Sequence, residues 1–225
     1  MKIAILGTGG VGKAFAARLT GLGHSVMVGT RDRSATLSKT EKGSFSEFMS
    51  QNPSVTLGSF AEAAAFGEMI INVSKGASTR DVIKAAGEAN LSGKIVIDIS
   101  NPLDFSKGMP PCLIPEFSNT HSLGEEIQKM VPDAKVVKTL NTMWNGLMLD
   151  PNMLAGGNHI NYICGNDADA KGQVIKLLQE FGWRVENILD LGDITNARAT
   201  EATLPIWLRV YGAKKTGAFN FTIVS

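Results

Sequence analysis

The chain has 225 residues, enough for a single α/β domain with a modest appendage. Hydrophobic residues make up 44% and charged residues 19%, which supports a full core and excludes a disordered chain. The formal net charge is only +1 and no long run of Lys or Arg occurs, so nucleic acid is not an expected partner.

Cysteine and histidine usage does not suggest a metal site. Cys112 and Cys164 are far apart and predict two reduced thiols, and the three histidines are isolated. No apolar run reaches the roughly 20 residues that cross a bilayer. Lys2 leads into a strand that ends before Gly7, a pattern unlike a signal peptide. We therefore expect a cytoplasmic protein without a membrane partner.

The first half of the chain alternates between short apolar strands and helices. Strands are predicted over residues 2–6, 26–29 and 69–73. Apolar side chains at Val11, Phe15 and Leu19 have helical spacing and predict a helix over 10–22 that stops at Gly23. The segment 33–67 predicts one or two helices, with capping-box patterns that begin at Ser44 and Ser59.

The second half continues the alternation. Helices are expected to open at Ser78 and Ser122, and Asp167 is expected to cap a helix that runs to Phe181. The Pro-rich segment 101–115 predicts a loop over the sheet edge. Further strands are predicted over 94–99, 135–140, 161–164 and 185–189, and a last helix over 195–211 before an apolar tail.

This order predicts the α/β class. We expect a Rossmann-type, doubly wound and mostly parallel sheet with helices on both faces. Residues 1–191 would form the dinucleotide-binding domain, and residues 192–225 a small C-terminal helical extension packed on the same domain.

A glycine-rich segment between the first strand and the first helix carries the functional prediction. Residues 7–12 read Gly-Thr-Gly-Gly-Val-Gly and fit the G-x-G-x-x-G pattern in the required strand-to-helix context. Gly7 would permit the tight turn, Gly9 would let the backbone approach a pyrophosphate, and Gly12 would let the helix pack close to the sheet. Free amides at the helix start would bind the anion. The alternative is an ordinary glycine-rich turn.

The end of the second strand favours NADP over NAD. Thr30 offers a hydroxyl and Arg31 a guanidinium fork, both suited to a dianionic 2′-phosphate, and Arg33 would add a second guanidinium from the loop. Asp32 is the competing signal, because an inward-pointing carboxylate there would bind a ribose hydroxyl and favour NAD. The alternative for Arg31 is a solvated surface charge.

Later strands end in small polar residues. Val73 and Ser74 would line the ribose or nicotinamide, while Asn101, Thr139 and Asn141 would contact the carboxamide or the substrate. Plain turn chemistry explains each of these residues equally well.

No acid–base pair, nucleophile or metal-ligand set is predicted, so no catalytic residue is assigned. Asp98 reads as the only charged residue inside an apolar strand, and such a carboxylate needs partners. Trp144, Trp207 and Tyr211 read as core or interface residues, with a substrate-pocket role as the alternative for Trp207.

The chain resembles the coenzyme F420-dependent NADP oxidoreductases. The resemblance rests on residues 7–12 and 29–31, with Ile-Cys-Gly-Asn-Asp at 163–167 and Asp-Leu-Gly-Asp at 190–193, and it covers nearly the whole chain. Residues 138–142, Lys-Thr-Leu-Asn-Thr, are also similar to the cytosolic reductase domain of the six-transmembrane metalloreductases, which pass hydride from NADPH to a flavin.

The resemblance implies NADP(H) as cofactor and a flat acceptor, a deazaflavin or flavin, as the second substrate. It places the pyrophosphate on Thr8, Gly9, Gly10 and Val11, the 2′-phosphate on Thr30 and Arg31, and the nicotinamide near Val73, Ser74 and Thr139. Hydride would move directly between the rings, so positioning would supply the rate.

The chain departs from the family pattern in three places. Gly10 stands where the archaeal enzymes carry Asn, residues 72–75 lack a Pro, and the 101–115 loop is longer. These loops would shape the acceptor pocket, so the identity of the acceptor stays open.

Two other functions also stay open: an NADPH-dependent imine or hydroxyacid reductase, and a non-catalytic NADPH sensor. The apolar tail and last helix need cover, which either a homodimer or the neighbouring domain surface would provide.

Overall fold

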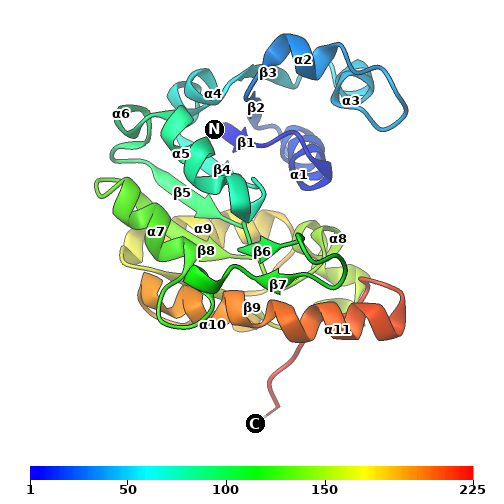
Figure 1. Cartoon of the computed structure of the whole chain (residues 1–225), viewed down its shortest axis with the longest axis vertical. Helices are drawn as coiled ribbons and strands as arrows, with labels where there is room; N and C mark the ends of the chain where they lie inside the picture. The colour runs from blue at the N-terminus through cyan, green and yellow to red at the C-terminus, as the bar shows by residue number, and fades with distance from the viewer. Residues whose placement is uncertain (225) are drawn as a thin grey trace.

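The computed structural model describes residues 1–224, and its centre is one eight-stranded sheet (Figure 1). The strand order is β10-β9-β8-β5-β4-β1-β2-β3. Neighbouring strands are parallel except for the antiparallel pair β8 and β9. The strands are β1 (Lys2–Leu6), β2 (Ser25–Thr30), β3 (Thr56–Ser59), β4 (Met69–Asn72), β5 (Ile95–Asp98), β8 (Lys135–Thr139), β9 (Asn161–Gly165) and β10 (Ile188–Asp190).

The strand order reverses at β1, which confirms the Rossmann-type α/β prediction. From β1 the chain moves outward through β2 and β3, then returns to the other side of β1 through β4 and β5. Ligands of open α/β sheets bind at such a switch point, outside the carboxyl ends of the strands. The division of the chain at residue 191 stays a prediction.

Helices cover both faces of the sheet. In Figure 1, α5 and α7 lie in front of the sheet and α9 lies behind β8. The helices are α1 (Gly10–Gly21), α2 (Arg33–Leu37), α3 (Phe45–Gln51), α4 (Phe60–Phe66), α5 (Thr79–Ala86), α6 (Glu88–Leu91), α7 (Leu123–Met130), α8 (Asn145–Leu149), α9 (Ala168–Glu180), α10 (Ala197–Ala202) and α11 (Leu204–Lys214). No helix within residues 1–224 is long and apolar enough to span a membrane. The predicted cytoplasmic location stays a prediction.

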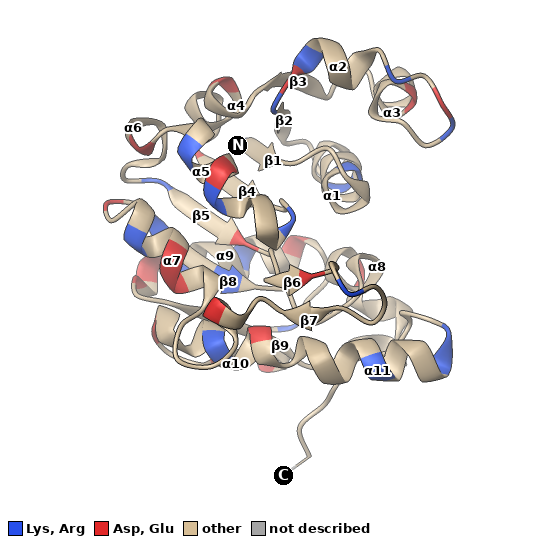
Figure 2. Ribbon diagram, in the orientation of Figure 1, with Lys and Arg blue, Asp and Glu red and all other residues tan. Residues whose placement is uncertain are grey.

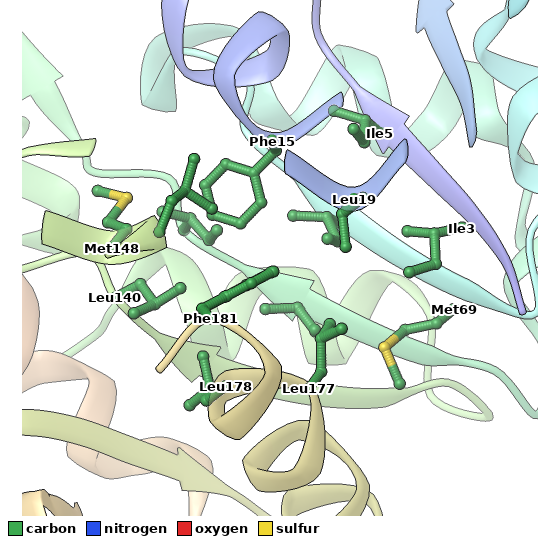
Figure 3. Close-up of a cluster of buried hydrophobic side chains, with 14 of the residues drawn as sticks. Ile3, Ile5, Phe15, Leu19, Met69, Leu140, Met148, Leu177, Leu178 and Phe181 are labelled. Atoms are coloured by element: carbon green, nitrogen blue, oxygen red, sulfur yellow. The ribbon is translucent and has the colours of Figure 1, made fainter. Parts of the chain in front are cut away.

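The sheet divides the core into two clusters because side chains alternate along each strand. Ile3 and Ile5 of β1 join the cluster under α1, α8 and α9, whereas Ala4 and Leu6 join the cluster under α4, α5 and α7. Figure 3 shows the first cluster, with α1 facing α9. Its aromatic centre is an edge-to-face pair of Phe15 with Phe181, whose ring centroids are 5.8 Å apart.

Most of the predicted helix starts are confirmed by their caps. Ser59 forms a complete capping box with Glu62. The side chains of Ser44, Ser122 and Asp167 each accept a hydrogen bond from the third residue that follows. Ser78 precedes α5 as predicted, but its side chain makes no capping bond.

Several element boundaries differ from the predictions. The segment 33–67 contains three short helices and the edge strand β3, whose four residues are too few to show an alternating pattern. The loop 101–115 contains a small antiparallel pair, β6 (Leu103–Asp104) and β7 (Cys112–Leu113). The segment 185–189 begins as a 3-10 turn, and α8 was not predicted.

The last predicted helix is broken in two. It begins as a 3-10 turn at Ile194–Asn196, continues as α10, and restarts as α11 after Thr203. Pro205 lies in the first turn of α11, where its missing amide costs no helical hydrogen bond.

A fully buried ion network joins this C-terminal region to the sheet. The Nζ of Lys138 lies 2.7 Å from Asp98 Oδ2 and 2.8 Å from Glu201 Oε1, and all three side chains are fully buried. Burial opposes the charged ammonium, but the two carboxylates outweigh it and raise the pKa of Lys138. Asp98 is therefore not the only charge inside an apolar strand, because Lys138 of β8 is its partner.

We expect Lys138→Met to destabilise the protein by about 3–5 kcal/mol, because it leaves two buried carboxylates without their cation. Lys171→Met is the matched control: Lys171 pairs with Asp190, whose side chain is 48% exposed and becomes hydrated when the pair is lost. That control should cost about 1 kcal/mol. Urea unfolding of both variants measures the difference, and equal losses would contradict the role of the network.

Candidate dinucleotide and substrate site

The glycine loop between β1 and α1 has the geometry that a dinucleotide requires. Gly7 has φ +134°, a conformation that L side chains rarely adopt. A Cβ at Gly12 would overlap the carbonyl oxygen of Gly7, so only glycine lets the helix approach the turn so closely. Cβ atoms at Gly9 and Gly10 would meet nothing within 4 Å, so the outer side of the loop is open.

The amides that open α1 are free to bind an anion. Its N-cap residue is Gly9, which has no side chain to cap the helix, and the first turn contains no acidic residue. The first amides of a helix have no partner inside the helix, and they carry the positive end of its dipole. The loop formed by Thr8, Gly9, Gly10 and Val11 therefore fits the pyrophosphate of NADP(H).

The end of β2 borders a separate cavity of about 120 Å³. It is lined by Thr30 and Arg31, by Ser59, Phe60 and Ala61 of the β3–α4 junction, and by Asp81, Val82 and Ala85 of α5. Arg31 is exposed and forms no ion pair with any residue of the described chain, whereas Arg33 lies 3.9 Å from Glu62. Arg31 is therefore the guanidinium that is available to a ligand in this cavity.

The structure weakens two other candidates at this strand end. The carboxylate of Asp32 accepts a hydrogen bond from Ala35 and caps α2, so it is engaged away from a ribose. Thr36 donates its hydroxyl to the Asp32 carbonyl, so in the 2.8 Å bond between the Thr30 and Thr36 hydroxyls Thr30 is the donor. Thr30 then has no hydrogen left for a phosphate, which sequence reasoning missed.

A second cavity lies at the carboxyl ends of β4 and β5 and has a volume of about 410 Å³. Of the predicted site residues, Val11, Val73, Ser74, Asn101 and Asn141 line it together. The cavity therefore begins next to the glycine loop and continues along the strand ends, as expected for the nicotinamide end of a dinucleotide.

Thr139 does not reach this cavity. It is fully buried, its hydroxyl donates to the Tyr162 carbonyl at 2.7 Å, and it accepts a hydrogen bond from Asn161. The structure assigns it to the β8–β9 pair. Its predicted place near the nicotinamide is not supported. Successive side chains of a strand point in different directions, and the Thr139 side chain does not point into the cavity.

Two hydrogen bonds link Asn101 with Asn141. The Asn101 side chain donates to the Asn141 carbonyl at 2.8 Å, and the Asn141 side chain donates to Asn101 Oδ1 at 3.0 Å. Ser74 donates its hydroxyl to Asn72 Oδ1 at 2.7 Å. These contacts fix the loops that follow β4, β5 and β8, so the polar side of the cavity is rigid.

The other side of the cavity is apolar and was largely missed by the sequence analysis. It comes from the 101–115 segment, the region around α8 and the last helix, namely Leu103, Phe105, Met143, Trp144, Met148, Leu204, Trp207 and Leu208. The spacing of Leu204, Trp207 and Leu208 along one helix was the available signal. Lys75, at the rim, is the one titratable side chain among the described residues that line the cavity.

Neither cysteine contributes a nucleophile to this site. Cys112 and Cys164 are free thiols, as predicted, and neither lines the cavity. Burial in β9 raises the pKa of the Cys164 thiol to about 12, so it stays protonated at neutral pH.

The fold and the loop together define a Rossmann-type dinucleotide-binding protein. Residues 2–102 match the family described as NADP oxidoreductase, coenzyme F420-dependent. The crystal structure of a candidate F420-dependent NADP-reductase from Arthrobacter sp. FB24 is 52% identical, covers 100% of both chains and has a TM-score of 0.96. The chain therefore belongs to the coenzyme F420-dependent NADP oxidoreductase family and is an NADP-dependent oxidoreductase.

More distant relatives extend the comparison. Metalloreductase STEAP3 of Rattus norvegicus is 29% identical over 212 residues, which are 92% of this chain and 38% of that protein. The chain thus spans little more than a third of the length of this curated relative. An imine reductase of Streptomyces aurantiacus, 13% identical with a TM-score of 0.63 over 96% of this chain and 64% of its own, shares the fold.

We expect Arg31→Ala to weaken NADPH binding by about 1.5–3 kcal/mol, the usual loss for a hydrogen bond to a charged group. NADH affinity should change little, because NADH lacks the 2′-phosphate. Calorimetric titration with both cofactors measures this. Arg33→Ala is the control for general loss of positive charge and should cost less, since Arg33 lies beside Glu62. An equal loss for NADPH and NADH would show that Arg31 does not read the phosphate.

Proposed function

We propose that the protein transfers hydride between NADPH and a planar acceptor, a deazaflavin such as coenzyme F420 or a flavin. One observation carries this proposal: the cavity next to the glycine loop is rigid and polar on one side, apolar and aromatic on the other, and lacks an acid–base pair among its described residues. The family and the Arthrobacter neighbour support the deazaflavin. The flavin is supported by the resemblance of residues 138–142 to the reductase domain of the six-transmembrane metalloreductases.

In this proposal the residues of the chain bind NADPH and the acceptor and orient them toward each other. When bound, NADPH supplies the hydride. The amides of Gly9, Gly10 and Val11 hold the pyrophosphate, and Arg31 holds the 2′-phosphate. Val73 and Ser74 border the nicotinamide end, where the paired Asn101 and Asn141 fix the opposite loop.

The chemistry needs no side chain of the protein to react. The acceptor takes one hydride from NADPH and one proton from water, and NADP⁺ remains. The apolar wall of the cavity keeps water from the reacting carbons, and orientation of the two rings supplies the rate. This explains a site without an acid–base pair.

Two other functions fit the same cofactor site. An imine or hydroxyacid reductase needs a proton donor, and Lys75 is the side chain in the described cavity lining that offers one. A non-catalytic NADPH sensor would bind the cofactor without turnover. The aromatic wall favours the planar acceptor, because such a wall has no use in a sensor.

The proposal is tested by following NADPH oxidation with coenzyme F420, FMN, FAD, ferric chelates and quinones, and with a cyclic imine and a 2-oxoacid for comparison. We expect turnover with a deazaflavin or flavin. Lys75→Met should lose much less than the roughly 100-fold that removal of a general acid costs. Turnover confined to the imine or oxoacid, or none with any acceptor, would contradict the proposal.

We also propose a homodimer formed through α11. Figure 2 shows that α11 carries few charged residues, and Ile206 and Tyr211 are 53% and 42% exposed. Within the apolar tail, Phe219 is buried against its own chain, whereas Ile223 and Val224 are 54% and 91% exposed. Analytical ultracentrifugation should find a dimer at micromolar concentration, and Ile206→Glu should shift it to the monomer. A wild-type monomer would refute this proposal.

A further inference from the structure

Trp144 is a large aromatic side chain at the cavity that the proposed function has not used. It lies at the N-cap of α8, lines the 410 Å³ cavity beside the glycine loop and is 39% exposed. An exposed indole costs free energy in water that a ligand recovers by covering it. Its position on the apolar side of the cavity makes Trp144 a candidate contact for the second substrate.

Two glycines set the position of this indole. A Cβ at Gly146 would overlap the six-membered ring of Trp144. A Cβ at Gly217 would lie 2.8 Å from its Cγ and 3.0 Å from its Cβ. Gly146 belongs to α8, whereas Gly217 lies in the tail that follows α11. Both segments thus leave room for the indole, and neither could carry a side chain at that point.

The tail that carries Gly217 is held in place beyond it. The Asn220 side chain donates to the Ile160 carbonyl at 2.9 Å and lies 2.8 Å from His159 Nδ1. The amide of Ile160 donates to the Phe221 carbonyl at 3.1 Å. The backbone against Trp144 is therefore fixed, and the indole is oriented before any ligand binds.

The second tryptophan of the cavity differs from the first. The ring of Trp207 is nearly parallel to those of Tyr211 and Phe219, with interplanar angles of 11° and 24° and centroids 5.5 and 5.2 Å away. Its stacking surface is thus used inside the protein, and its Nε1 is buried without a partner among the described residues. Trp207 is therefore a fixed part of the cavity wall, whereas 39% of Trp144 is exposed and can be covered by a ligand.

We propose that Trp144 is the stacking platform for the conjugated ring of the acceptor. This proposal rests on the proposed function, since it assumes that the cavity takes a planar acceptor. Oxidised flavins and deazaflavins are electron-poor rings, and an indole is the most electron-rich aromatic side chain, so offset stacking between them is favourable. Trp144 would then determine the affinity for the acceptor, whereas the amides of α1 would determine the affinity for NADPH.

The test measures binding of oxidised FMN and of oxidised coenzyme F420 to the NADP⁺ complex, in which no turnover takes place. Trp144→Ala should weaken binding of the probe roughly tenfold or more, the usual effect of removing a stacked aromatic side chain. Trp144→Phe should retain most of the affinity, and NADPH binding should stay within about twofold. The quenching of tryptophan fluorescence by the probe should fall in both variants.

Gly217→Ala gives a second, independent variant, because its methyl group displaces the indole without removing it. It should weaken probe binding, and Gly212→Ala, where a Cβ meets nothing within 4 Å, is the matched control that should not. Steady-state kinetics should show the same split, with the acceptor KM raised and the NADPH KM unchanged.

Failure of this proposal can be distinguished from failure of the proposed function. If wild-type protein binds a probe and Trp144→Ala binds it equally well, the platform role is wrong and the planar acceptor stands. Equal loss of probe and NADPH binding in Trp144→Ala would also refute the platform, since Trp144 would then have no selective effect on the acceptor. If wild-type protein binds neither probe, the proposed function fails, and the platform with it.

Discussion

The buried contact of Lys138 with Asp98 and Glu201 is the interaction on which the architecture depends. Asp98 ends a central strand, Lys138 lies on the next strand, and Glu201 comes from α10. The Glu201 carboxylate also accepts hydrogen bonds from the backbone amides of Leu123 and Gly124, the first residues of α7. One cation thus joins the middle of the sheet, a covering helix and the C-terminal region, and a buried charge of this kind is stable only with all its partners in place.

The network lies directly beneath the functional cavity. Asp98 Oδ1 accepts hydrogen bonds from Ser100 and from Asn72, and Asn72 in turn holds Ser74. The same interactions that fix α10 therefore fix the polar side of the cavity, while α11 continues from α10 to supply Leu204 and Trp207 on the apolar side. Cofactor and acceptor sites are built on one rigid unit, which suits a reaction that depends on orientation.

Local signals predicted the cofactor half of the site, and distant contacts made the other half. The glycine loop, the cap of Ser59 and the strand end at Arg31 depend on neighbouring residues, so the sequence reveals them. The pairing of Lys138 with Glu201 joins residues far apart in the chain and has no sequence pattern. No sequence pattern shows that the Thr139 side chain bonds to β9 rather than lining the cavity. No pattern reveals the short edge strand β3 either.

The sequence by itself determined the alternation of strands and helices, the dinucleotide loop and the position of a guanidinium near the second strand, because each depends on backbone geometry within a few residues. Only the tertiary structure decided which strand ends share a cavity and which hydroxyls already donate hydrogen bonds within the protein. It also decided that Gly146 and Gly217 both pack against Trp144. Those outcomes depend on packing between segments, where a single ångström separates an open aromatic surface from a steric overlap.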